Sequence, residues 1–431
     1  MKLTTLEEEL SSGVLDSFLV PIYGAAPADL AVARERLGEV ARHYRHRFDG
    51  ESEGEEVSLF TAPGRTEMGG NHTDHQRGRV LAGAVSMDMV ACAGPNGSRW
   101  IRIASQGYPE VAVNLDDLER KSREEGTSAS LVRGVAHALT ERGYELQGFS
   151  ACVSSTVPGG AGLSSSAAYE ILIGVMLNHL SCGGAVSPVE LAQFGQYAES
   201  QYFGKPCGLL DQMACSIGGV IGIDFADPAE PAVEEVDFNM DESGHVLCIV
   251  ESGGNHADLT AEYASIPDEM REVAAFFDKQ VLREVDEAIF WASLAALREQ
   301  VGDRAVLRAI HFFEDNARVP AQVEALRQRR FDDYFAMVAQ SGQSSGVQLQ
   351  NLYATKTPQA QDVVVALSLA KHLLGGRGAV RVHGGGFAGT IQAYVPVDSV
   401  KEFSAGMEAV LGEGSCHTVR VRPIGGAVII A

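Results

Sequence analysis

The sequence has few basic residues for its length, and this shortage restricts the partners it can bind. Lysine and arginine total 34 against 57 aspartates and glutamates, which gives a formal net charge of −23 over 431 residues. A nucleic acid or an anionic membrane needs a basic face on its partner. We therefore expect neither partner, and if phosphate binds, we expect backbone amides and a metal ion to do much of the binding.

The cysteines also lack the pattern of a disulfide framework or a zinc site. There are seven, an odd number, and none belongs to a Cys-x-x-Cys pair. The N-terminal residues lack the apolar segment of a secretion signal, and no run of 18 apolar residues follows. These absences predict a cytoplasmic protein in a reducing compartment.

The length exceeds what one ordinary hydrophobic core accommodates. An acidic, proline-containing loop at 228–235 interrupts the pattern of helices and strands, and a strongly helical stretch follows over about 261–339. We therefore predict two domains, 1–225 and 226–431.

A glycine- and serine-rich segment, residues 157–168, joins three glycines to three consecutive serines. It lies between a predicted strand at 149–156 and a predicted helix at 166–180. Glycines allow close approach of the backbone to an anion, and a helix N-terminus adds unpaired N–H donors. The segment is typical of a phosphate-binding loop, although a flexible loop capped by serine has the same composition.

Neither of two familiar nucleotide-binding motifs is present in its full form. The glycine- and serine-rich segment, which we call the serine loop, has no Gly-Lys-Ser/Thr ending and is therefore not a P-loop. The nearby Gly204-Lys205 is followed by proline. The glycines of 384–389 match Gly-x-Gly-x-x-Gly, but residues 390–395 continue as a strand where a dinucleotide site needs a helix. The second motif therefore predicts a tight glycine turn between strands.

A dense polar cluster occupies residues 63–75. Arg65, His72 and Asp74 could together bind an anion and several hydroxyl groups, which suits a polyol substrate. A second interpretation is a binuclear metallohydrolase, because His72, Asp74 and His75 are possible ligands and residues 253–258 repeat Gly-Gly-Asn-His-x-Asp. A polar surface turn is the third interpretation.

Asp211 lies between leucine-rich and methionine- and alanine-rich flanks. A carboxylate in such a setting is partly buried and needs a partner, unless it serves only as the cap of a helix after Gly208. Glu199, twelve residues earlier on a predicted helix, carries no signal by itself.

Taken together, these segments resemble galactokinases, members of the GHMP small-molecule kinases, over about residues 20–425. Residues 64–75 are similar to the sugar-binding signature Gly-Arg-x-Asn-x-Ile-Gly-Glu-His-x-Asp-Tyr, and residues 158–168 to the family's phosphate loop. Residues 384–389 resemble the C-terminal glycine loop, and residues 206–212 the Met-Asp-Gln site. The resemblance implies an α+β, two-domain GHMP kinase fold with the active site in the cleft between the N- and C-terminal domains.

The resemblance also implies an ATP-dependent sugar 1-kinase, most simply for galactose, that uses Mg²⁺ and acts as a monomer. By position, Asp211 matches the catalytic base and Arg65 the residue that orients it. The remaining matches are to the metal ligands Ser166 and Glu199, to the ATP-phosphate contacts Gly160, Gly162, Ser164, Ser165 and Ser166, and to the sugar contacts Asn71, His72, Asp74, Gly208 and Tyr263.

Several positions depart from the family pattern. Asn71 replaces a glutamate and His75 a tyrosine, while Thr66-Glu67 replaces a small residue and an asparagine. Ser128 and Leu131 stand where the family has an aromatic pair near adenine. These departures leave open a kinase for a related sugar, such as an N-acetylhexosamine, arabinose or another polyol. A non-catalytic sugar and ATP sensor and the metallohydrolase remain further alternatives.

Overall fold

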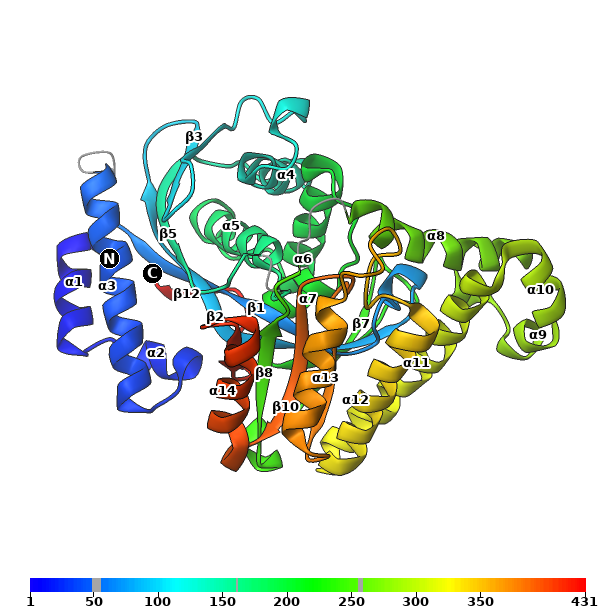
Figure 1. Ribbon diagram of the computed structural model, residues 1–431. Coiled ribbons are helices and arrows are strands. Elements are labelled where there is room, and N and C mark those ends of the chain that lie inside the picture. The colour runs from blue at the N-terminus through cyan, green and yellow to red at the C-terminus, as the bar shows by residue number, and fades with distance from the viewer. Residues whose placement is uncertain (49–55, 160–161, 255–258) are drawn as a thin grey trace.

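Two β-sheets and the helices around them organise the chain (Figure 1). The computed structural model describes residues 1–48, 56–159, 162–254 and 259–431. Over these residues one sheet has eight strands and the other has four. The larger sheet contains β1 (Ser58–Gly69), β2 (Arg79–Pro95), β3 (Trp100–Ser105), β4 (Val111–Asn114), β5 (Phe149–Ser155), β6 (Val220–Asp224), β7 (Ala232–Val236) and β12 (Ala427–Ile430).

Strand β2 is the centre of the larger sheet. It is 17 residues long and pairs with β1 along its length, with β5 at one end and with β6 at the other. Successive side chains of a strand point to opposite faces of the sheet, so they pack into two different hydrophobic clusters. In β1, Phe60 packs into the cluster under the helices of residues 128–217. Leu59 packs into the cluster under the helices of residues 3–48.

The smaller sheet is antiparallel, with the order β11-β8-β10-β9. It contains β8 (His245–Glu251), β9 (Ala379–His383), β10 (Thr390–Pro396) and β11 (Cys416–Val419). Two helices, α13 (Asp362–Leu374) and α14 (Val400–Leu411), cover one of its faces and share a hydrophobic cluster with it (Figure 1). The predicted glycine turn is confirmed, because residues 384–389 connect β9 to β10.

The helices divide into groups by the surface that they cover (Figure 1). The N-terminal group is α1 (Leu3–Ser12), α2 (Asp16–Tyr23) and α3 (Pro27–Phe48), and the central group is α4 (Ser128–Glu141), α5 (Ser165–Cys182), α6 (Pro188–Tyr197) and α7 (Leu210–Ile217). The C-terminal helices are α8 (Thr260–Phe276), α9 (Glu287–Ala292), α10 (Leu294–Val301), α11 (Asp303–Arg327), α12 (Phe331–Ser344), α13 (Asp362–Leu374) and α14 (Val400–Leu411). None of the described helices is both long and apolar enough to cross a membrane.

Most of the predicted elements are present, with two differences of extent. The helical stretch predicted over 261–339 consists of five separate helices, α8 to α12. Strand β1 continues through Pro63 and Gly64, although these residue types usually end a strand, because a register shift between Pro63 and Arg65 accommodates the proline.

The chain crosses between the two sheets more than once. The predicted boundary between residues 225 and 226 falls between β6 and β7, which pair with each other in the larger sheet. After the smaller sheet is complete, β12 returns to pair with β1. The division into two domains stays a prediction.

A buried carboxylate, Asp88 of β2, connects the N-terminal helices to the larger sheet. It accepts hydrogen bonds from Thr61 Oγ1 at 2.7 Å, Tyr23 Oη at 2.9 Å and Arg422 Nη1 at 2.8 Å, and it also pairs with Arg36. Burial disfavours its charge, but the two guanidinium groups outweigh this effect and lower the pKa of Asp88. The cluster thus depends on the charge at Asp88.

We expect Asp88→Ala to lower the free energy of unfolding by about 3–5 kcal/mol, because it leaves the buried guanidinium of Arg422 without its carboxylate. Urea unfolding at neutral pH measures this loss. Asp117→Ala, at an exposed ion pair with Lys121, is the control and should leave the midpoint nearly unchanged. Equal midpoints for the two variants would contradict the structural role of Asp88.

Candidate active site

Arg65 and Asp211 form a bidentate ion pair at the centre of the site. Arg65 Nε donates to Asp211 Oδ1 at 2.6 Å, and Nη2 donates to Oδ2 at 2.8 Å. Ser164 Oγ also donates to Asp211, while Arg65 Nη1 donates to the carbonyl of Gly162. Strand β1, helix α7 and the serine loop therefore meet at one carboxylate, whose side chain is 33% exposed.

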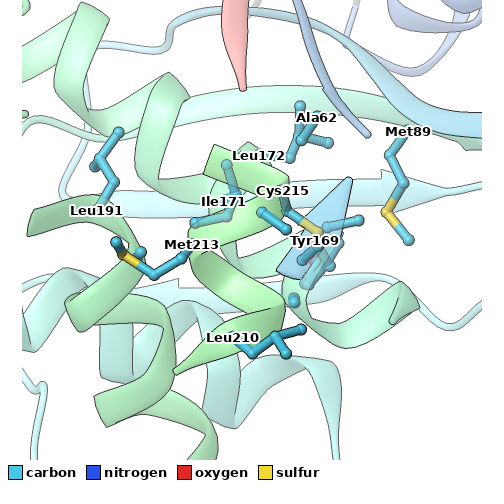
Figure 2. Packing of buried hydrophobic residues seen from close by; sticks show 14 of the residues in the cluster. Ala62, Met89, Tyr169, Ile171, Leu172, Leu191, Leu210, Met213 and Cys215 are labelled. Carbon is cyan, nitrogen blue, oxygen red and sulfur yellow. The ribbon is translucent and has the colours of Figure 1, made fainter. Parts of the chain in front are cut away.

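The position of Asp211 follows from the apolar face of α7. Leu210 and Met213 are buried three residues apart on this helix and pack into the main core, where Ile171 and Leu172 of α5 also lie (Figure 2). Asp211 follows Leu210 immediately and therefore points to a different side of the helix. The core holds α7 in place, and the carboxylate faces Arg65.

Asp211 is held in its ionised form. Burial works against the charge, but the ion pair and hydrogen bonds with Arg65, together with the hydroxyl of Ser164, lower the pKa of Asp211 below its usual value. The expected partner for this aspartate is confirmed. An ionised carboxylate of this kind can orient a substrate hydroxyl and accept its proton.

The serine loop is pressed against the middle of β1, at Gly64 and Arg65. The N–H of Arg65 donates to the carbonyl of Leu163 at 3.1 Å, and a Cβ on Gly64 would lie 2.7 Å from that same oxygen, so only glycine fits there. Gly162 and Ser164 have φ angles of 68° and 57°, and α5 begins at the next residue, Ser165.

The first N–H groups of α5 have no carbonyl partners within the helix, as at any helix N-terminus. They lie beside the Arg65–Asp211 pair, an arrangement that suits an anion. Of the predicted phosphate contacts, Gly160 lies outside the described residues.

A second polar group lies beside the first turn of α5. Glu199, on the π-helical turn Ala198–Phe203, accepts a hydrogen bond on Oε1 from Ser166 Oγ at 2.9 Å and another from Lys205 Nζ at 3.1 Å. Its Oε2 accepts from Gln212 Nε2 at 2.8 Å. The structure thus brings together the two predicted metal ligands, Ser166 and Glu199.

Another carboxylate lies behind Glu199. Gln212 Nε2 also donates to Glu170 Oε2 at 2.9 Å, and Glu170 Oε1 has no partner among the described groups. Burial, reinforced by the charge of Glu199, raises the pKa of Glu170 well above its usual value. The surroundings of Glu170 therefore favour its protonated form.

Oxygen donors from Ser166 and Glu199 fit a Mg²⁺ ion, which proteins typically hold through one or two carboxylates together with substrate phosphates and water. Within the described ranges, no group of three or more histidine, cysteine, aspartate and glutamate side chains is placed to hold a metal by itself. The donor set thus suits a cation that arrives with a phosphate ligand.

Asp74 makes an unusually close contact with Gly208, which lies three residues before Asp211 in the chain. A Cβ on Gly208 would lie 1.7 Å from Asp74 Oδ2, so the carboxylate occupies the space that any side chain would need. Asp74 belongs to the turn after β1, and Gly208 lies just before α7. The contact brings two of the predicted sugar-binding positions together.

We expect Gly208→Ala to displace Asp74 and weaken binding of the sugar by at least about tenfold, since a misplaced hydrogen-bonding group loses on the order of 1.5 kcal/mol. Equilibrium titration with the sugar measures the effect. The thermal midpoint should fall only slightly, and ATP affinity should be unchanged. Unaltered sugar affinity would contradict a role for this contact in binding.

His72 is held as a neutral imidazole. It has a φ of 61°, and its Nε2 lies 3.0 Å from the carbonyl of Gly385, to which it donates. Burial, together with the neighbouring His75 ring at 5.8 Å, lowers the pKa of His72 to about 3. His72 therefore keeps one ring nitrogen free of a proton, which can accept a hydrogen bond from a hydroxyl group.

In the predicted sugar signature, the substitutions at positions 67 and 71 amount to an exchange of one glutamate and one asparagine. Asn71 stands where the signature has glutamate, Glu67 stands where it has asparagine, and Asn71 Nδ2 donates to Glu67 Oε1 at 2.9 Å. Asn71 is completely buried, and it also bonds the carbonyl of Gly384 and the amide of Asn351. The carboxylate has moved four residues along the chain, and sugar contact by Asn71 stays a prediction.

Glu67 is buried beside Arg381 of the smaller sheet. Burial raises the pKa of Glu67 to about 7, although Arg381 and Arg65 act in the opposite direction. Because the folded protein then binds a proton that the unfolded chain has released, stability falls as pH rises between about 4.5 and 7.

We expect Glu67→Gln to remove this contribution to the pH dependence. The difference in unfolding free energy between wild type and variant should change by up to about 3 kcal/mol between pH 4.5 and 7, in the direction that favours the variant at higher pH. Urea unfolding at a series of pH values measures it. A difference independent of pH would contradict the raised pKa.

Tyr263 supports the glycine loop between β9 and β10. Its hydroxyl donates to the carbonyl of Gly386 at 3.1 Å, and its ring lies where a Cβ on Gly385 would meet it at 2.7 Å. Phe387 packs against the same ring at 5.4 Å. Direct contact of Tyr263 with sugar stays a prediction.

The positions expected near adenine carry no aromatic ring. Ser128 is the first residue of α4, and Leu131 is buried in the main core. The contacts to the base are therefore made elsewhere or by smaller groups, and nucleotide preference stays a prediction.

The metallohydrolase interpretation requires both histidine-containing motifs. His72, Asp74 and His75 do lie in one turn, with His75 Nε2 3.9 Å from Asp74 Oδ1. In the second motif, His256 and Asp258 lie outside the described residues. Since His72 Nε2 is engaged by Gly385, the described half of the arrangement is better suited to binding hydroxyl groups.

Sequence reasoning missed three contributors to the site. Gln212 bridges two carboxylates, and its only signal was its place after Asp211. Glu67 appeared as an unrelated substitution, although the reciprocal exchange with Asn71 could have indicated contact. Lys205 was dismissed with the failed P-loop match, and it contacts Glu199.

A glycine loop at a helix N-terminus, an arginine-bound aspartate and a hydroxyl–carboxylate pair define the site of a small-molecule kinase. The model of the GHMP kinases N terminal domain matches residues 130–219, and that of the galactokinase galactose-binding signature matches residues 42–95. The chain is therefore similar to the GHMP kinases over residues 130–219 and to galactokinases over the sugar-binding signature at residues 42–95.

Solved structures of this family have the same fold. Galactokinase from Lactococcus lactis, complexed with galactose, is 24% identical, with a TM-score of 0.77 over 92% of this chain and 99% of that one. Mevalonate kinase from Methanococcus jannaschii is 13% identical, with a TM-score of 0.60 over 85% and 98%. Phosphomevalonate kinase from Streptococcus pneumoniae is 14% identical, with a TM-score of 0.56 over 84% and 99%.

Proposed function

We propose that the protein is an ATP-dependent sugar 1-kinase that transfers the terminal phosphoryl group of ATP to the anomeric C1 hydroxyl of galactose. The observation that supports this most strongly is the Arg65–Asp211 ion pair, to which Ser164 of the serine loop donates a hydrogen bond and whose aspartate follows Gly208 by three residues. A phosphate donor on one side and a hydroxyl acceptor on the other would face each other across this pair.

Asp211 acts as the base in this proposal. It orients the C1 hydroxyl and takes its proton as the oxygen attacks phosphorus, while Arg65 fixes the carboxylate and stabilises the transferring group. Because phosphoryl transfer needs positioning and charge stabilisation more than covalent help, a base with a lowered pKa is sufficient.

Ser166 and Glu199 would hold Mg²⁺, which neutralises charge on the phosphate oxygens when it is bound. The amides at the start of α5, with Gly162, Ser164 and Ser165, would bind the phosphates. Gly160 belongs to the same proposed loop.

The sugar would contact His72, Asp74 and Gly208. Asn71 and Tyr263 would complete the sugar site next to these residues. The signature match favours galactose over an N-acetylhexosamine, arabinose or another polyol. The ionised Asp211 in its bidentate pair favours a catalyst over a sensor. We further infer that the protein is cytoplasmic, in accord with its seven free cysteines. We also infer that it is a monomer.

We expect Asp211→Asn to lower kcat by about 10²–10⁴-fold, because the amide accepts no proton from the sugar hydroxyl. ADP release measured with MgATP and a panel of sugars gives the rate, and calorimetry should show ATP affinity within about threefold of wild type. Asp117→Asn, an exposed aspartate, is the matched control.

Galactose should give the highest kcat/KM of the panel. Turnover of another sugar alone would move the assignment to that sugar, and retained activity in Asp211→Asn would overturn the base. Binding of sugar and ATP without turnover would identify a sensor, and failure with every sugar would overturn the proposed function.

A further inference from the structure

Lys205 is held at a fixed place in the backbone near the proposed phosphate site. Gly204, with a φ of 86°, ends the π-helical turn, and the N–H of Lys205 donates to the carbonyl of Glu199 at 3.1 Å. Pro206 then restricts the chain on the other side. The lysine is therefore anchored by local structure, unlike a lysine on an exposed helix face.

The ammonium group lies against the oxygen proposed to bind the cation. Lys205 Nζ is 3.1 Å from Glu199 Oε1, which also accepts from Ser166 Oγ at 2.9 Å. The Glu199 side chain is 2% exposed, whereas the Lys205 side chain is 63% exposed. The ammonium group of Lys205, on a flexible side chain, thus lies between the buried carboxylate of Glu199 and the solvent.

The chemistry of ATP requires positive charge that the rest of the site supplies only in part. ATP brings several negative charges into a protein whose own net charge is −23. Arg65 directs three of its N–H groups at Asp211 and Gly162. In P-loop enzymes a lysine reaches the β- and γ-phosphates, and here the serine loop has no such residue.

We propose that Lys205 is a catalytic residue that binds the β- and γ-phosphate oxygens of ATP, a role that rests on the proposed kinase function. When the phosphates arrive, the flexible side chain swings from Glu199 Oε1 to a phosphate oxygen, which leaves that carboxylate oxygen for the cation. No bond is made or broken by Lys205.

The test measures nucleotide binding without metal or turnover. Isothermal calorimetry in EDTA should show that Lys205→Met weakens ATP binding by about 10- to 100-fold, the loss expected for one charge-assisted hydrogen bond. AMP binding should change less than twofold because AMP lacks the β- and γ-phosphates. Lys205→Arg should recover part of the ATP affinity, and Lys401→Met, at an exposed position on α14, should behave as wild type.

Kinetics with MgATP and the sugar that the wild type uses provide a second readout. Lys205→Met should lower kcat/KM for ATP by at least about tenfold and change KM for the sugar less than threefold. Unchanged ATP affinity in EDTA, or an equal loss for AMP, would overturn the proposal and leave Lys205 as a counter-ion of Glu199. If the wild type turns over no sugar and binds no ATP, the proposed function fails as well.

Discussion

The ion pair between Arg65 and Asp211 is the interaction on which the site depends. Its members are 146 residues apart in the chain and come from β1 and α7. A buried guanidinium and a partly buried carboxylate are each unfavourable alone, so each requires the other in a defined geometry. Through Gly162 and Ser164 the same pair fixes the loop that precedes α5.

The position of Arg65 in turn depends on contacts between the two sheets. The residue after it, Thr66, accepts a hydrogen bond from Gln392 at 2.7 Å and lies 3.1 Å from His383 Nε2. Glu67 pairs with Arg381 of β9. The end of β1 is therefore held by side chains of the smaller sheet, and this junction positions both the serine loop and the turn after β1.

The local pattern predicted the elements well where one period dominates. Helix α5 and strand β5 lie close to their predicted bounds because apolar spacing identifies each of them. The pattern failed at β1, since proline and glycine usually end a strand, and the register shift at Pro63 keeps this one intact. It also failed to divide the helices of 261–339, whose breaks are decided by packing.

For the site, the residue types and their order were enough to suggest a kinase, because glycines, serines, an arginine and an aspartate carry recognisable chemistry. The exchange of Glu67 and Asn71 was read as two separate changes, since spacing alone does not reveal which side chains touch. Lys205 was noticed only in the failed P-loop match, because the local pattern does not show that its side chain contacts Glu199.

The sequence by itself determined the chemical groups available and the short segments that carry them, including the loop before α5 and the signature that begins within β1. Only the tertiary structure decided which groups became partners: Asp211 with Arg65, Glu199 with Ser166 and Lys205, and Asn71 with Glu67. Local spacing encodes helix and strand periods, whereas the contacts within the site arise from burial and charge pairing between segments that packing brings together.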